Sequence, residues 1–217
     1  MPAKNAVKRY SENGYYHIYN RGAGKNDIFL NEQDYGVFLH YLKDYLSPPK
    51  LPTPEEVAAM KNPYLHKNYY GEIDLLSFCL MPNHFHLLVK QKKARSIVGF
   101  MRSLLIRYSC YFNKNHQRVG HLYQGIYKGV LVEIDEYLWW VSRYIHLNPL
   151  NLLAREQKLE DYSYSSYPVY LGKIKIDWVK PDLILANIKN YRDFVEGPDD
   201  KDHQAPEKMI DLIIETS

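Results

Sequence analysis

The sequence has no long hydrophobic run and only two cysteines. Nowhere in its 217 residues is there a stretch close to the roughly 20 consecutive apolar residues that a membrane-spanning helix needs. The first residues, MPAKNAVKRYSENG, lack the apolar segment of a secretory signal, so we expect a cytoplasmic protein with no membrane partner. Cys79 and Cys110 both lie among apolar or helix-forming residues, which predicts two buried thiols and no disulfide.

Acidic residues are missing from the middle of the chain. Between Leu75 and Val132 there is no Asp or Glu, whereas residues 193–217 contain eight acidic residues and two lysines. Solvated surfaces usually mix both signs of charge, so a long acid-free stretch predicts an anionic partner. The phosphates of a nucleic acid fit best, ahead of an anionic membrane surface or an acidic protein. The basic residues of this stretch that we predict to contact DNA are Lys92, Arg102, Arg107, Arg118 and Lys128.

The pattern of apolar residues predicts a ferredoxin-like α+β fold. Strand and helix patterns alternate in the order 15–22 (strand), 31–46 (helix), 73–91 (two strands), 96–115 (helix) and 125–134 (strand). The two strands of 73–91 form a hairpin that turns at Met81-Pro82-Asn83. The resulting βαββαβ order predicts an antiparallel sheet with two helices on one face. A further helix over 135–148, with Asp135 as its N-cap and Pro149 after its end, is expected to cover the open face.

Two segments lie outside this pattern. Residues 47–71 are rich in proline, and we predict an insertion with one short helix, in which Thr53 is the N-cap and Glu56 its capping-box partner. Residues 193–217 are charged and contain the Gly/Pro linker EGPDDKDHQAPEK before the apolar MIDLII. We therefore expect one domain over 1–192, followed by an acidic linker and a short tail over 193–217.

Two histidines, His84 and His86, follow the hairpin turn in the sequence MPNHFHLLVK. Side chains at i and i+2 share one face of a strand, so both imidazoles point the same way and Phe85 points into the core. They are either hydrogen-bonded core histidines or ligands of a metal ion. A metal site needs a third ligand from the covering helix, where Tyr144 and Asn148 lie at i and i+4. Two imidazoles and an amide oxygen would leave coordination positions open, as in a catalytic site.

These motifs resemble the REP-associated tyrosine transposases, a branch of the single-tyrosine HUH transposases. The resemblance extends from about Tyr15 to Leu171 and is carried by YNRG (19–22), HFH after MPN (84–86), GHLYQGIYKG (120–129), RYIHLNP (143–149) and YSYSSY (162–167). It implies that His84, His86 and Asn148 bind a divalent metal ion, Mg²⁺ or Mn²⁺. It also implies that Tyr144 is the nucleophile, and we include Arg21 of YNRG among the predicted DNA contacts. His146, two residues after Tyr144 on the helix, is expected to point away from it.

The function expected from this resemblance is DNA transposition and recombination by a metal-dependent endonuclease. A tyrosine can attack single-stranded or hairpin DNA and conserve the bond energy in a 5′-phosphotyrosine for later strand joining. From the ligand types alone, imidazole would equally suit zinc, iron or copper. Two alternatives are a ferredoxin-like nucleic-acid-binding module of the RRM kind and a metal-stabilised domain without activity. The sequence leaves open whether the protein is a monomer or a homodimer.

Overall fold

A four-stranded antiparallel sheet lies at the centre of the protein. The structure is a computed structural model that describes residues 10–49, 53–59, 67–133 and 135–198. The sheet has the strand order β2-β3-β1-β4 and consists of β1 (Tyr15–Arg21), β2 (Ile73–Met81), β3 (His84–Gln91) and β4 (Lys128–Val132). With the helices between them, the strands follow the βαββαβ order. The ferredoxin-like fold predicted from the sequence is therefore confirmed.

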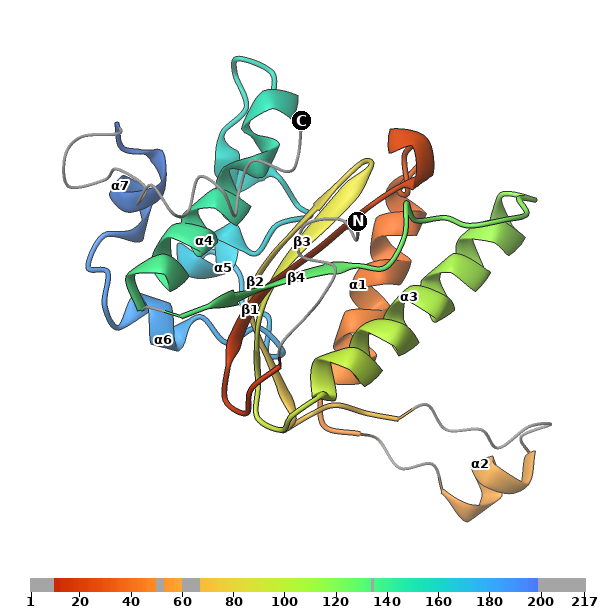
Figure 1. Ribbon diagram of the computed structural model, residues 1–217. Helices are drawn as coiled ribbons and strands as arrows, with labels where there is room; N and C mark the ends of the chain where they lie inside the picture. Colours follow the sequence, from red (N-terminus) through yellow and green to blue (C-terminus); the bar gives the residue numbers. More distant parts are fainter. Residues whose placement is uncertain (1–9, 50–52, 60–66, 134, 199–217) are drawn as a thin grey trace, which may run out of the picture.

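Two long helices cover one face of the sheet (Figure 1). They are α1 (Glu32–Leu46) and α3 (Ser96–Asn115). Their apolar residues recur at helical spacing, so each helix buries one side: Phe38 of α1 and Leu104 of α3 are fully buried in the same cluster as Phe85 of β3. A fully buried side chain of this size contributes about 2 kcal/mol of hydrophobic free energy.

The opposite face is covered by the segments that follow β4, so the sheet is the middle one of three layers (Figure 1). The helices of this layer are α4 (Asp135–Leu147), α5 (Tyr167–Tyr170), α6 (Asp182–Leu185) and α7 (Tyr191–Glu196). Val141 and Ile145 of α4 are buried in one cluster with Leu88 of β3. The prediction that the helix after β4 closes the open face is confirmed.

The end of α4 differs slightly from the predicted helix. α4 ends at Leu147, and a 3-10 segment, Asn148–Leu152, begins directly after it. Leu147 keeps helical angles (φ −79°, ψ −14°), so the chain continues without a break. The side-chain Nδ2 of Asn148 donates to the carbonyl of Tyr144 at 2.8 Å, and the i, i+4 relation of these two residues is retained.

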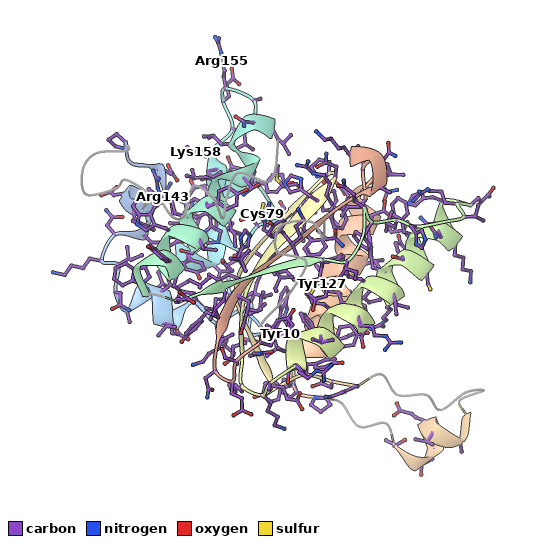
Figure 2. The ribbon with its side chains drawn as sticks, viewed as in Figure 1. Tyr10, Cys79, Tyr127, Arg143, Arg155 and Lys158 are labelled. Carbon is purple, nitrogen blue, oxygen red and sulfur yellow. The ribbon has the colours of Figure 1, made fainter. Side chains whose placement is uncertain are left out.

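The predicted domain boundary after residue 192 falls inside α7, which is folded structure and not linker. Val195 is fully buried, and Arg143 of α4 donates to the carbonyls of Phe194 (2.8 Å) and Gly197 (3.1 Å). Figure 2 shows Arg143 beside α4 and α7. Because this segment is rich in acidic residues, its composition did not indicate that one side of the helix is buried. The rest of the predicted tail, 199–217, lies outside the described residues.

The predicted insertion is described in part, since 50–52 and 60–66 lie outside the described residues. Its short helix is α2 (Pro54–Ala59), which lies away from the sheet (Figure 1). The predicted capping box is present: the Thr53 N–H donates to Glu56 Oε2 at 2.8 Å, and the Glu56 N–H donates to Thr53 Oγ1 at 3.3 Å. Tyr69, near the end of the insertion, is buried in the core with α1 and α3.

The cysteine prediction is half right. Cys79 in β2 is buried, but Cys110 is exposed, because it lies on the side of α3 that faces away from the sheet.

No helix in the described part of the chain combines the length and apolar character needed to cross a membrane.

Candidate active site

β1 and β3 bring three histidines together on the face that α4 covers. The strands pair antiparallel, with Arg21 opposite His84 and Tyr19 opposite His86. Opposite residues share a face of the sheet, and so do residues two apart on a strand, which adds His17 to the same face. The pairing register, and not the strand pattern alone, therefore assembles this cluster.

His84 is held in one tautomer by the turn before it. Its Nδ1 lies 2.6 Å from Asn83 Oδ1, and the orientation of that amide is fixed because Asn83 Nδ2 donates to the carbonyl of Lys25 at 3.2 Å. Burial lowers the pKa of His84 to about 4, and the positive charge of Arg21 acts in the same direction. The ring therefore has a single proton at neutral pH. The 2.6 Å contact with an amide oxygen, much shorter than the 3.4 Å contact of Nε2 with Asn148, assigns that proton to Nδ1 and leaves the lone pair on Nε2.

The lone pair of His84 Nε2 faces a second acceptor, Asn148 Oδ1, at 3.4 Å. The amide of Asn148 is oriented by its own bond to the Tyr144 carbonyl, which only Nδ2 can donate. With the proton of His84 on Nδ1, neither facing atom has a hydrogen, and they repel one another unless a cation lies between them. Two ligand atoms at about 2.1 Å from one metal ion lie roughly 3.0–3.4 Å apart. The pair therefore fits a divalent cation.

His86 supplies a further acceptor beside this pair. Its ring centroid lies 5.0 Å from that of His84, its Nδ1 lies 2.9 Å from His17 Nε2, and its Nε2 is buried with no hydrogen-bond partner among the described residues. A buried polar atom left unpaired costs about 1–3 kcal/mol, so a bound cation at Nε2 would stabilise the site. Nowhere in the described ranges do three His, Cys, Asp or Glu side chains form a metal cluster. The candidate set is thus two imidazoles completed by the amide of Asn148.

Tyr144 lies against these histidines because α4 crosses the sheet above them. Its ring packs edge-on to His86, with centroids 5.4 Å apart, and to His17, at 5.9 Å. Tyr144 is half-buried, so part of the residue is accessible to solvent. The structure therefore brings together all four residues predicted for the catalytic and metal site, His84, His86, Tyr144 and Asn148.

His146 points away from Tyr144, as predicted. Its Nε2 lies 2.8 Å from Ser166 Oγ and its Nδ1 lies 2.7 Å from the Tyr191 hydroxyl. Burial lowers the pKa of His146 to about 3, so it is neutral in the folded protein. It joins α4 to the segments that follow it and takes no part in the site.

The six residues predicted to contact DNA do not form one surface. Arg21 and Lys128 lie on the histidine face, since Arg21 is opposite His84 and Lys128 is opposite Tyr19 with its ammonium 5.8 Å from that ring. Their charges therefore lie on the side where DNA would have to approach Tyr144.

The other predicted DNA contacts lie elsewhere, and two of them are neutralised. Arg107 on α3 forms an ion pair with Asp44 of α1 at 3.1 Å, and Lys92 forms one with Asp74 at 3.3 Å. Arg118 donates to the carbonyl of the nearby residue 121 at 3.4 Å. The stretch between Leu75 and Val132 has no acidic residue, but its surface is not free of acidic groups. The carboxylates of Asp44 and Asp74, which lie outside the stretch, form ion pairs with its basic residues.

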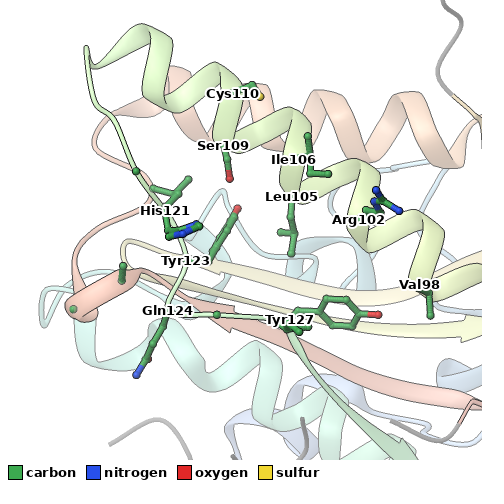
Figure 3. A pocket seen from close by; sticks show the side chains of 16 residues that line it. Val98, Arg102, Leu105, Ile106, Ser109, Cys110, His121, Tyr123, Gln124 and Tyr127 are labelled. Atoms are coloured by element: carbon green, nitrogen blue, oxygen red, sulfur yellow. The ribbon is translucent and has the colours of Figure 1, made fainter. Parts of the chain in front are cut away.

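Arg102 lies on the far side of the sheet from the histidines, in a groove of about 910 Å³ between α3 and residues 120–127 (Figure 3). Leu105 of α3 and Tyr127 also line the groove. The Tyr127 hydroxyl lies 2.7 Å from that of Tyr10 (Figure 2). The sheet separates this groove from Tyr144, so Arg102 does not belong to the candidate active site.

Two residues of the site, His17 and Asn83, are absent from the sequence-based prediction. Alternation along YYHIYNRG puts His17 on the same face as Arg21, which is the one sequence signal that pointed to it. Asn83 was identified only as a turn residue. His17 is placed at the site only by the β1–β3 register, whereas Asn83 is placed there by its contact with the adjacent His84.

The sequence of the site region matches a known family. Residues 59–148 match the family described as Transposase IS200 like, a match that covers less than half of the chain but contains His84, His86, Tyr144 and Asn148. Transposases are DNA-cleaving enzymes, which agrees with the class of enzyme predicted from the sequence. No protein with a curated function matches the chain.

The fold also occurs in a solved structure. A REP-associated tyrosine transposase bound to a REP hairpin aligns with a TM-score of 0.52 and 13% identity, over 82% of this chain and 92% of that chain. A candidate transposase from Deinococcus radiodurans R1 aligns at 14% identity over 67% of this chain and 95% of that chain, with a TM-score of 0.37 that is too low to indicate a common fold. The resemblance predicted from the sequence is confirmed: residues 59–148 are similar to the IS200-like transposases, and the α+β fold is similar to that of a REP-associated tyrosine transposase.

Proposed function

We propose that this protein is a metal-dependent transposase that cleaves and rejoins single-stranded DNA through a 5′-phosphotyrosine at Tyr144. The observation that carries the proposal is the contact between the Tyr144 and His86 rings, beside the facing acceptors of His84 and Asn148. A nucleophile beside a cation site is what phosphoryl transfer to tyrosine requires. The REP hairpin bound by the structurally similar transposase supports hairpin-containing DNA as the substrate.

His84, His86 and Asn148 would hold a divalent cation, Mg²⁺ or Mn²⁺, which when bound neutralises and orients the scissile phosphate. Both imidazoles are neutral, as metal ligands must be, because burial lowers the pKa of His86 well below its usual value and that of His84 to about 4. Arg21 and Lys128 supply positive charge on the same face for the flanking phosphates.

Tyr144 is the residue that forms the covalent bond. Its phenol oxygen attacks phosphorus, the bond from phosphorus to the 3′ oxygen breaks, and the upstream strand leaves with a 3′-hydroxyl. The proton lost by the phenol is balanced by the proton gained at the 3′ oxygen. One phosphodiester is exchanged for one phosphotyrosine, so a later attack by a 3′-hydroxyl can rejoin DNA without ATP.

The two alternatives predict different structures or products. An RRM stacks bases on aromatic side chains of an open sheet face, whereas α4 covers the corresponding face in this protein. A metal-stabilised domain without activity yields no covalent product. A cytoplasmic location, and the choice between monomer and homodimer, stay predictions from the sequence.

Covalent capture tests the proposal. Wild-type protein is incubated with Mn²⁺ and a pool of hairpin oligonucleotides with randomised single-stranded flanks, and protein–DNA adducts are separated by denaturing electrophoresis. We expect an adduct that peptide mass analysis maps to Tyr144 and that Tyr144→Phe does not form. Tyr137→Phe, on the same helix, is the matched control and should form as much adduct as wild type. An adduct on another tyrosine, or none with any hairpin, would contradict the proposal.

A further inference from the structure

We propose that His17 is a positioning residue, which holds His86 in the tautomer whose Nε2 is free to bind a cation. The inference rests on the metal role proposed above for His86. It concerns a side chain on the neighbouring strand, outside the predicted ligand set.

His17 and His86 form a buried pair between β1 and β3. Both side chains are almost inaccessible, with 2% and 1% of their surface exposed, and His17 Nε2 lies 2.9 Å from His86 Nδ1. The rings stack with centroids 5.1 Å apart and an angle of 24°. This is the only polar contact of either ring among the hydrogen bonds of the described residues, since His17 Nδ1 and His86 Nε2 have none.

The short distance requires that one ring donate and the other accept. A neutral imidazole has a single ring proton, so each ring has one proton to place. If His86 Nδ1 donates to His17 Nε2, the lone pair of His86 Nε2 is free. If His17 Nε2 donates instead, the proton of His86 lies on Nε2, which then cannot bind a metal ion.

Two further features favour the first arrangement. Either arrangement leaves one buried N–H without a partner among the described residues, at His17 Nδ1 in the first and at His86 Nε2 in the second, but only the first leaves an acceptor on His86 that a bound cation can satisfy. His84 is arranged in the same way, because Asn83 Oδ1 accepts from its Nδ1 and leaves Nε2 free. An acceptor behind each ligand's Nδ1 fixes both the tautomer and the direction of the ring.

His17 also touches the nucleophile. Its ring packs edge-on to Tyr144 with centroids 5.9 Å apart, while its Nε2 holds His86. One side chain of β1 therefore sets the position of a metal ligand relative to the ring that attacks the phosphate.

Tautomers can be measured directly in the metal-free protein. In protein labelled with ¹⁵N-histidine, long-range ¹H–¹⁵N correlation spectra separate protonated from unprotonated ring nitrogens. We expect wild-type His86 to be protonated at Nδ1 and unprotonated at Nε2, and His17→Gln, whose amide oxygen can accept from Nδ1, to preserve this state. A proton on Nε2 of wild-type His86 would overturn the inference.

Mn²⁺ binding, followed by loss of the free-ion electron paramagnetic resonance signal, supplies the second readout. His17→Phe keeps a ring but cannot accept a hydrogen bond, and we expect its Mn²⁺ dissociation constant to rise about 10- to 100-fold. His17→Gln should retain most of the affinity. Val130→Ala is the control, because Val130 lies opposite His17 on β4 and its truncation removes packing beside His17 while leaving both imidazoles and their hydrogen bond in place.

The outcomes separate this inference from the proposed function. Wild-type affinity in His17→Phe, equal losses in the Phe and Gln variants, or an equal loss in Val130→Ala would each overturn the positioning role. Wild-type protein that binds no Mn²⁺ would instead contradict the metal site itself, and the wild-type tautomer spectrum would still decide the role of His17. If His17→Phe does not fold, the Gln variant and that spectrum decide it.

Discussion

At the scale of single residues, two amides define the chemistry of the site. Asn83 and Asn148 each use Nδ2 on a backbone carbonyl, which turns both Oδ1 atoms toward His84. A neutral imidazole can donate to only one of them, so the other oxygen and the free ring nitrogen face each other as two acceptors. This arrangement is the one expected of the proposed cation site, and it is not expected of a pair of hydrogen-bonded core histidines.

The metal ligands give the first residue-scale prediction. His84→Ala or His86→Ala should lower Mn²⁺-dependent cleavage of hairpin DNA by at least about 100-fold, because each removes a ligand of the proposed ion. Retention of the DNA should change little, since phosphate contacts come from basic residues. Gel assays of cleavage and of binding measure the two effects. His40→Ala, an exposed histidine of α1, should behave as wild type; wild-type cleavage by the His84 and His86 variants would refute the metal assignment.

Buried neutral histidines predict how stability depends on pH. The folded pKa of His146 is about 3, below its ordinary value of about 6.5, so between these values the unfolded chain binds a proton that the folded protein does not. The contribution of the neutral His146 to the free energy of unfolding is then fully present above pH 6.5 and is lost as pH falls toward 3. Between pH 6 and 5 each such histidine should contribute a loss of about 1.4 kcal/mol per pH unit. Urea unfolding measures this slope, and His146→Gln should reduce it by that amount; an unchanged slope would contradict the prediction.

At the scale of elements, Asp34 joins α1 to the end of α3. It is fully buried and accepts from the Leu30 N–H (2.8 Å), the Tyr111 hydroxyl (3.0 Å) and His116 Nε2 (2.9 Å). Asp34→Ala leaves all three donors without this partner and should lower the free energy of unfolding by about 3–5 kcal/mol. Urea denaturation checks the value.

Asp44 provides the matched control for this prediction. It also links α1 to α3, through Arg107, but about a third of its side chain is exposed, so solvent screens the pair. Asp44→Ala should cost no more than about 1 kcal/mol. Equal losses in the two variants would show that the buried network around Asp34 has no special part in holding the helices together.

At the scale of the whole molecule, the distribution of charge depends on how the chain folds back on itself. Arg21 lies on the histidine face, whereas Arg107 is paired with Asp44 and stacked on Tyr41 with 3.8 Å between guanidinium and ring centre. Arg21→Gln should weaken binding of hairpin DNA and reduce the slope of log K against log salt by about one unit. Arg107→Gln should leave that slope unchanged. Titrations over a range of salt concentrations measure both, and the reverse result would place the DNA on α3.

The C-terminal residues give a second prediction at this scale. Removal of 199–217 takes away six acidic residues and two lysines, so the formal net charge rises from +3 to +7. We expect cleavage to persist and affinity for nonspecific single strands at low salt to increase, because a competing acidic segment is lost. Truncation after Val195 should also lower the melting temperature, since Glu196 accepts from the Tyr167 hydroxyl and the Gly197 carbonyl accepts from Arg143. A fall in stability on removing 199–217 alone would show that those residues pack on the domain.

Secondary structure and the motif residues were accessible from the sequence because both depend on neighbours along the chain. The apolar residues of α1 and α3 recur with the helical period of 3.6 residues, and the side chains of the strands alternate with a period of 2.0. The Pro82-Asn83 turn between β2 and β3 is also a local signal. Tyr144 and Asn148 are one helical turn apart within a short motif. Such features require no knowledge of what lies across the sheet.

The rest was decided by tertiary structure, since it depends on which distant segments meet. His17 contacts His86 across 69 positions of sequence, and a shift of one residue in the β1–β3 register would turn it to the other face. Asp44 neutralises Arg107 only because α1 packs beside α3. The sequence by itself determined the elements and pointed to the proposed nucleophile and the proposed ligand types. The imidazole of His17 beside His86, the face on which each basic residue lies and the packing of α7 came from the tertiary structure, because contacts between distant segments leave no periodic signal in either segment alone.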